Sequence, residues 1–108
     1  MRVRLPFKGG REQVGTRPAV LMQVDEGTQK SPTLVIVPLT SQLAAARFGH
    51  SVQLEPGEHS GLQMQSVAMV YQLTAVDRVN VVEQLGALSH DEFESIRQAV
   101  IQMVTPSA

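Results

Sequence analysis

Thr33-Leu34-Val35-Ile36-Val37-Pro38-Leu39 is the stretch that decides the fold. From Leu34 onward its side chains are apolar at every position, without the alternation of polar and apolar residues that a half-exposed strand shows. A short run of this kind, rich in β-branched residues, is typical of a strand that is buried on both faces. We therefore expect a central strand here. Because proline lacks an N–H group, we expect its ladder to end or bulge at Pro38.

Further strands are predicted on either side of this one. Ala19–Val24 precedes it, and the long run within Met64–Val76 follows it and again reads as buried on both faces through Val67–Tyr71. Val3–Phe7 is predicted as a short edge strand, because its proline cannot donate to a ladder. His50–Leu54 alternates weakly and predicts one more strand, whereas Gln42–Phe48 fits either a helical turn or an ordered loop.

The clearest helix signal lies near the C-terminus. Ser89 and Glu92 have the spacing of a capping box, in which each side chain satisfies the other residue's backbone N–H. One apolar face follows at steps of three and four residues, formed by Phe93, Ile96, Val100 and Met103. Pro106 then stops the helix. The expected fold class is mainly β: about five strands that form a small SH3-like barrel or a curled antiparallel sheet, covered by this C-terminal helix.

Bulk composition excludes several classes of protein. With 108 residues, 43% of them hydrophobic, the chain is expected to be a single soluble domain spanning residues 1–108. The absence of cysteine excludes disulfides and thiolate metal sites. No window approaches 18 apolar residues, so no membrane span is expected, and the N-terminus has no signal-peptide core. A cytoplasmic location is the expectation.

Charge is distributed unevenly along the chain. Residues 1–17 carry five basic residues and one acid, a balance of +4, whereas residues 18–108 carry four basic and nine acidic residues, a balance of −5. A basic segment on an otherwise acidic chain suggests a local site for a polyanion. Part of this segment is Gly10–Pro18, GREQVGTRP, which presents charged side chains at the mouth of the predicted sheet.

This loop and several later motifs resemble the MazF/PemK family of toxin endoribonucleases. The matching stretches, in the family's order, are Gly10–Pro18, Ser31-Pro32-Thr33, Pro38-Leu39-Thr40-Ser41, Ser66-Val67, Gln72, Ala75-Val76-Asp77 and Leu85-Gly86-Ala87-Leu88-Ser89. The resemblance covers nearly the whole chain. It implies a CcdB/PemK-like fold and a toxin that cleaves single-stranded mRNA without a metal or other cofactor. It also implies a homodimer that is neutralised by a cognate antitoxin.

The resemblance also implies which residues carry the chemistry. In such a reaction the ribose 2′-OH attacks the adjacent phosphorus and displaces the 5′-oxygen. Arg17 is the expected cation for the phosphate oxygens, because a guanidinium matches their geometry and stays charged. Thr40 matches the second catalytic position, where its hydroxyl can donate to the phosphate or relay a proton. Glu12 is the third catalytic candidate, and its role as general base, as partner of Arg17 or as a brace for the loop stays open.

Six further residues are expected to contact RNA: Lys8, Arg11, Gln13, Thr16, Ser41 and Gln72. The two glutamines fit base recognition or a role in tying loops together. Tyr71 is suited to stacking on a base, but its apolar neighbours favour a place in the core.

Two departures from the family pattern are visible. The Arg-Gly-Asp strand that usually opens the family is missing, so the first strand is expected to be truncated. The arginine that usually follows Gln72 by two residues is replaced by Thr74, and a later arginine is replaced around Asn80. These departures keep an alternative open, in which a weakened homologue only binds its antitoxin or RNA. A gyrase poison of the same fold is a further alternative, although the intact Glu12–Pro18 loop argues against it.

Overall fold

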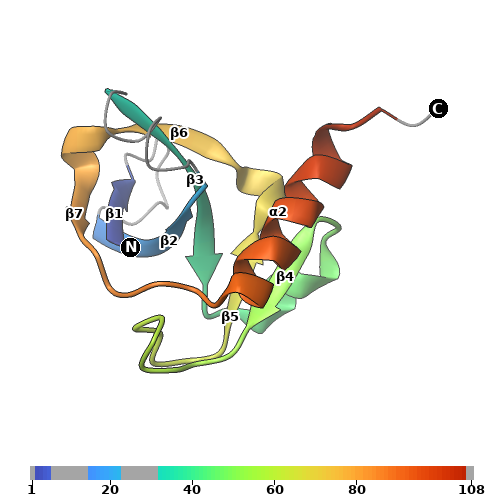
Figure 1. The fold of residues 1–108 in the computed structure, drawn as a ribbon, viewed down its shortest axis with the longest axis horizontal. Helices are drawn as coiled ribbons and strands as arrows, with labels where there is room; N and C mark the ends of the chain where they lie inside the picture. The colour runs from blue at the N-terminus through green and yellow to red at the C-terminus, as the bar shows by residue number, and fades with distance from the viewer. Residues whose placement is uncertain (1, 6–14, 23–31, 107–108) are drawn as a thin grey trace.

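The computed structural model describes residues 2–5, 15–22 and 32–106. Within these ranges the chain forms seven strands, three short 3-10 helices and one α-helix (Figure 1). The strands are β1 (Arg2–Leu5), β2 (Gly15–Leu21), β3 (Thr33–Thr40), β4 (Ser51–Leu54), β5 (Ser66–Met69), β6 (Thr74–Asp77) and β7 (Val81–Glu83). The helices are η1 (Leu43–Arg47), η2 (Val70–Gln72), η3 (Arg78–Asn80) and α2 (His90–Val104).

The strands form one antiparallel sheet in the order β4-β5-β3-β2-β1-β7, with β6 also paired to β3. Figure 1 shows β1, β2, β6 and β7 curling around one side, while α2 lies beside β4 and β5. The curled antiparallel sheet with a C-terminal helix is confirmed. The alternative of a closed barrel is wrong: among the described strands β6 and β7 are joined by η3 but do not pair with each other.

β3 is the central strand that the sequence predicts, and both of its faces are buried. One face contributes to a group that we call the curl cluster: Ala19, Leu34, Ile36 and Val76. The other face contributes to the helix cluster: Val20, Val37, Leu39, Leu54, Leu62, Ala68, Val70 and Ile96. Because successive side chains of a strand point to opposite faces, β3 can serve both clusters at once.

β3 continues through Pro38 to Thr40, but its ladder on one edge is interrupted at this residue, as the sequence predicts. The Met22 N–H donates to the Val35 carbonyl at 2.9 Å, so odd-numbered residues of β3 turn their backbone groups toward β2. Pro38 therefore turns its nitrogen toward the opposite edge. On that edge β6 pairs with Thr33–Ile36 and β5 with Leu39–Thr40, and neither partner pairs with Pro38. The residue without an N–H therefore lies between the part of β3 that pairs with β6 and the part that pairs with β5, at a break in pairing that we call the seam.

The predicted single strand over Met64–Val76 is wrong, because η2 divides it into β5 and β6. Ala68 pairs with Leu39, and Thr74 pairs with Ile36. The segment from Ala68 to Thr74 is therefore three residues longer than the segment of β3 that it faces. The extra residues form η2, which acts as a bulge of 3-10 geometry. The division puts Tyr71 and Gln72 outside the ladder.

The N-terminal strands differ from their predicted bounds. β1 pairs with β2 on one edge and with β7 on the other, so the expectation of an edge strand is wrong. Pro6 and Phe7, the end of that predicted strand, lie outside the described residues. β2 begins at Gly15 and therefore includes Thr16 and Arg17, which the sequence placed in the loop.

The predicted C-terminal helix is confirmed with its capping box. Ser89 Oγ accepts a hydrogen bond from the Glu92 N–H at 3.2 Å, and the Glu92 carboxylate accepts one from the Ser89 N–H at 2.9 Å. Ile96 is fully buried, and Phe93, Val100 and Met103 pack partly buried against the helix cluster. The helix ends at Val104, shortly before Pro106.

Candidate functional site

A pocket of about 400 Å³ opens where β3 ends. β2, β3, η1, β5 and η2 all contribute to its wall. Its lining residues are Arg17, Thr40, Gln42, Ala44, Ala45, Arg47, Phe48, Met69, Tyr71 and Gln72. We call this the strand-end pocket. It brings together three predicted site residues that lie far apart in the chain, Arg17, Thr40 and Gln72, and several residues that were not predicted.

Arg17 and Thr40 meet in the strand-end pocket because β2 pairs with β3. Ala19 lies opposite Pro38 in the antiparallel register, and the same register, continued by two residues, brings Arg17 opposite Thr40. Side chains of opposed residues lie on the same face of an antiparallel pair, about 5 Å apart at Cβ. Both residues are half-buried, so each side chain is oriented by the sheet and still reaches the pocket.

A backbone hydrogen bond fixes the hydroxyl of Thr40. Its Oγ1 accepts from the Gln42 N–H at 3.1 Å, at the point where the chain leaves β3 for η1. A hydroxyl has one donor and two acceptor positions. Accepting this bond therefore orients the oxygen while the O–H remains able to donate to a ligand in the pocket.

η2 supplies the opposite wall of the pocket. Gln72 is exposed and Tyr71 is half-buried, in contrast to Val70, which is fully buried in the helix cluster. The Tyr71 N–H donates to the His50 carbonyl at 3.2 Å, which ties η2 to the loop after η1. Core packing was the favoured interpretation of Tyr71, and the structure instead places its side chain at the edge of a pocket.

Arg47 and Phe48 are site residues that the sequence reasoning missed. Phe48 is 48% exposed as a residue, and the centroid of its ring lies 5.4 Å from that of Tyr71 with the ring planes tilted by 54°. The central carbon of the Arg47 guanidinium lies 4.9 Å from the Phe48 centroid, within the range of a cation–π contact. The available signal was an arginine next to an aromatic residue, close after the Thr40-Ser41 strand end.

The other predicted site residues are only partly accounted for. Ser41 lines a neighbouring pocket of about 260 Å³, whose wall it shares with Thr40. The backbone of Thr16 belongs to β2, opposite Arg4 of β1, but its side chain is not among those described. The remaining loop residues, Lys8, Arg11, Glu12 and Gln13, lie outside the described residues.

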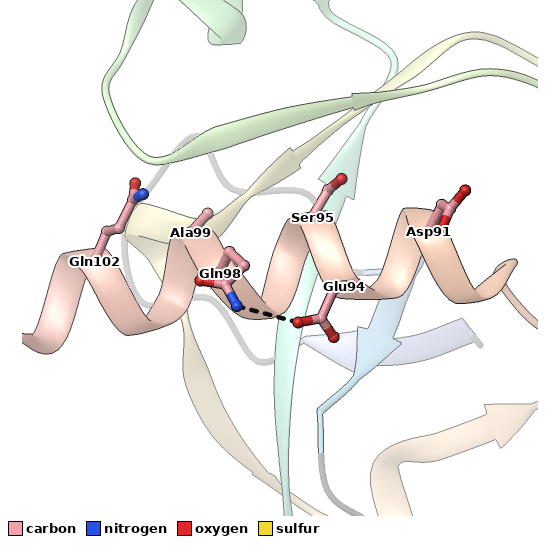
Figure 2. Close-up of a pocket in the computed structure, with 6 residues that line it drawn as sticks. All are labelled: Asp91, Glu94, Ser95, Gln98, Ala99 and Gln102. Atoms are coloured by element: carbon pink, nitrogen blue, oxygen red, sulfur yellow. Dashed lines mark hydrogen bonds between the residues drawn. The ribbon is translucent and has the colours of Figure 1, made fainter.

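The described lining of the strand-end pocket is basic, whereas the exposed face of α2 is acidic. The described lining of the pocket includes two arginines and no carboxylate. A shallow hollow on α2 is instead lined by Asp91 and Glu94 among neutral residues (Figure 2). Hydrogen bonds from Gln98 at 3.1 Å and from Arg97 at 2.8 Å, the former drawn in Figure 2, keep the pKa of Glu94 below its ordinary value. A polyanion would favour the strand-end pocket and be repelled from α2.

The described residues contain neither a candidate metal site nor a candidate membrane-spanning helix. No group of three or more His, Asp or Glu side chains among them is arranged to hold a metal ion. No helix in the same ranges is long and apolar enough to cross a membrane.

Residues 2–104 match the model of a protein family described as the PemK-like, MazF-like toxin of type II toxin–antitoxin systems. A curated relative named Endoribonuclease MazF, from Staphylococcus saprophyticus, is 30% identical over 91 residues. That alignment covers 84% of this chain and 75% of the relative.

Solved structures show the same fold. MazF (Form-I) from Deinococcus radiodurans superposes with a TM-score of 0.71 at 24% identity, and covers 95% of this chain and 91% of its own. The Mycobacterium tuberculosis toxin MazF-mt6 superposes with a TM-score of 0.69 at 15% identity, and covers 81% of this chain and 84% of its own.

Proposed function

The chain belongs to the family of PemK-like, MazF-like toxins of type II toxin–antitoxin systems, and from this premise we propose that it is an endoribonuclease that cleaves single-stranded mRNA at the strand-end pocket. A cognate antitoxin neutralises it, as membership of such a system implies. The curated relative named as an endoribonuclease supports the activity.

One observation supports the assignment of the reaction to this pocket. Arg17 and Thr40, which the resemblance marks as catalytic, come from two paired strands and line one cavity together with Gln72. A guanidinium and a hydroxyl within the same small pocket supply a fixed charge and a hydrogen-bond donor for a single phosphate.

The proposed reaction needs no redox step. The 2′-oxygen forms a bond to the adjacent phosphorus while the bond from phosphorus to the 5′-oxygen breaks. The products are a 2′,3′-cyclic phosphate and a free 5′-hydroxyl, after one proton leaves the 2′-OH and another reaches the 5′-oxygen. Arg17 stabilises the negative charge that grows on the non-bridging oxygens, and the Thr40 hydroxyl donates to one of them.

Glu12 is proposed to pair with Arg17 or to brace the loop, with action as the general base as its alternative role. Metal independence is part of the proposal, because a guanidinium and a hydroxyl can carry the charge stabilisation that a metal ion provides elsewhere.

The molecule is proposed to act as a homodimer in the cytoplasm. A two-fold pair would place two strand-end pockets on one particle. The antitoxin is proposed to cover that surface with a segment that folds on binding, which would prevent RNA from reaching Arg17 and Thr40.

The central test is RNA cleavage by purified protein in the presence of EDTA. Wild-type protein should cleave single-stranded RNA without added metal, and the products should end in a cyclic phosphate. Arg17→Ala should lower the cleavage rate by about 10²–10³, the usual loss when one charge-stabilising donor is removed. Mass spectrometry of the 3′ ends and gel-based rates provide the measurement.

Arg97→Ala is the matched control. Arg97 is an exposed arginine on α2 that pairs with Glu94 at 2.8 Å and is not part of the lining of the pocket. Its removal changes net charge by the same amount and should leave cleavage unchanged. RNA binding without cleavage by wild-type protein would favour the alternative of a weakened homologue. If the wild-type protein neither binds nor cleaves RNA, the proposed function is wrong.

A further inference from the structure

The strand-end pocket contains an aromatic surface that phosphate chemistry does not use. Phe48 exposes nearly half of its area, although exposed phenylalanine rings gain nothing from solvent. The Tyr71 ring packs against it in a tilted arrangement, at a centroid distance of 5.4 Å and an interplanar angle of 54°. Tilted pairs at this separation are the favoured arrangement of two aromatic rings. The support holds the Phe48 ring in place and leaves part of its surface open.

The backbone that presents Phe48 is anchored on both sides. Ser51 Oγ donates to the Phe48 carbonyl at 3.1 Å and lies 3.3 Å from that of Ala46. His50 adopts a φ of 59°, in the left-handed region that non-glycine residues rarely occupy. A turn held in this conformation by surrounding hydrogen bonds is common at functional sites. The ring is therefore preorganised rather than left on a loosely held loop.

The cation beside the ring indicates what this surface binds. Arg47 lies over Phe48 with its guanidinium carbon 4.9 Å from the centroid, and the same pocket contains Arg17. Single-stranded nucleic acids are bound by this combination: aromatic rings stack with bases, and neighbouring cations hold the phosphates. A peptide partner would need hydrogen-bonding or apolar complementarity along its length, whereas two cations and one open ring match a nucleotide.

We propose that Phe48 is a stacking platform for one nucleobase next to the cleaved bond, and that Arg47 holds the flanking phosphate. This inference rests on the proposed function and adds the subsite that orients the substrate. In the free protein the Arg47 guanidinium covers the ring. When RNA binds, the base takes its place on the ring and the guanidinium turns to the phosphate, exchanging a cation–π contact for a charge-assisted hydrogen bond.

Phe48 is a positioning residue in this scheme. Stacking on Phe48 fixes the base, and the ribose attached to that base brings its 2′-OH into line with the phosphate held by Arg17 and Thr40. Fixing this geometry is a large part of catalysis of an in-line displacement. Loss of the ring should therefore lower the affinity for RNA and also the rate at saturating RNA.

The test measures binding of an RNA that cannot react. A short RNA with 2′-O-methyl ribose and a fluorescent 2-aminopurine base is titrated with wild-type protein, Phe48→Leu and Phe48→Trp. Stacking on an aromatic ring quenches 2-aminopurine. Phe48→Leu should lose the quenching and bind about 5- to 150-fold more weakly, the usual range for one aromatic stack. Phe48→Trp should restore both signals, because it again offers an aromatic face.

A folding control and two outcomes complete the design. The half-exposed position of Phe48 should leave the thermal unfolding of both variants near that of wild type, which circular dichroism checks. If wild-type protein cleaves RNA but Phe48→Leu binds and quenches like wild type, the stacking platform is wrong and the proposed function stands. If wild-type protein neither binds nor cleaves RNA, the proposed function fails and the platform fails with it.

Discussion

Thr40 shows how a single residue connects the fold to the proposed chemistry. It is the last residue of β3, it lies opposite Arg17 by extension of the β2–β3 register, and its hydroxyl accepts a hydrogen bond from the Gln42 N–H. One oxygen thus accepts a hydrogen bond at the end of the strand and keeps its O–H available to a ligand in the pocket. The side chain has a structural and a proposed catalytic role, and the two effects of its substitution can be measured by separate assays.

Thr40→Val removes the hydroxyl and keeps the β-branched shape. We expect the cleavage rate at saturating RNA to fall by about 10²–10³, in line with the loss of one donor to the developing charge. The lost hydrogen bond should cost about 0.5–1.5 kcal/mol of unfolding free energy. Single-turnover kinetics and urea unfolding measure the two effects.

Thr40→Ser is the control for this experiment, because it keeps the hydroxyl without the methyl group. Its rate should stay within about tenfold of wild type, since the donor is retained. Full activity of Thr40→Val would remove Thr40 from the mechanism and leave it only its place at the strand end.

The sequence predicts some of the individual residues of the site and not others. Arg17, Thr40 and Gln72 were identified through the family resemblance, and the structure brings all three to one pocket. Arg47 and Phe48 were not, because nothing local distinguishes an arginine beside a phenylalanine from a solvated pair. Their role depends on η2, which places Tyr71 against the ring and is itself invisible in the sequence.

Among the elements, α2 and η2 mark the two extremes of predictability. The capping box of α2 lies within one turn, and its apolar face repeats at steps of three or four residues, so the sequence alone specifies both. η2 interrupts an apolar run without glycine or proline. Its existence follows from the register of β5 and β6 on β3, a long-range property that no local pattern reports.

The N-terminus of α2 also sets an acid limit on stability. The Ser89 N–H and then the His59 ring, at 2.8 Å, hold the pKa of Glu92 below its ordinary value of 4.5. A carboxylate whose pKa is lower in the folded state stabilises the fold above its unfolded pKa, and this contribution is lost as the pH falls through the folded pKa. Stability should therefore decline below about pH 4.5 partly through this group.

Glu92→Gln tests this titration. A glutamine at the third helical position can still complete the capping box but has no charge to lose. The difference in unfolding free energy between wild type and Glu92→Gln should be largest near neutral pH and shrink in acid, as measured by urea unfolding at several pH values. Glu58→Gln, at an exposed turn, serves as the control for loss of one negative charge. A difference that stays constant with pH would contradict the role of Glu92.

For the whole molecule, the distribution of charge matters more than its sum. The chain carries a net charge of −1, yet the described lining of the strand-end pocket contains two arginines, and α2 presents Asp91 and Glu94 on its exposed face. The field should guide RNA toward the pocket and away from the helix, although the protein as a whole is slightly acidic.

Salt dependence measures this arrangement. For a single-stranded nucleic acid, each neutralised phosphate adds about −0.7 to the slope of log affinity against log salt. Arg17→Ala and Arg47→Ala should each reduce the slope by about 0.7, and Arg97→Ala should leave it unchanged. Fluorescence anisotropy with non-cleavable RNA at several salt concentrations gives the slopes. Equal slopes for all three variants would place the RNA elsewhere on the protein.

The seam at Pro38 has a consequence for how the molecule fluctuates. β6 pairs with the first half of β3 and β5 with the second, so the curl cluster and the strand end depend on different partners. A local opening that separates β6 from β3 would break the hydrogen bonds to Thr33–Ile36 only. It would not need to extend past Pro38, which has no N–H to bond. Such a division allows two cooperative units within one small domain. The part of β3 that carries Thr40 can then stay paired with β5 while the part paired with β6 unfolds locally.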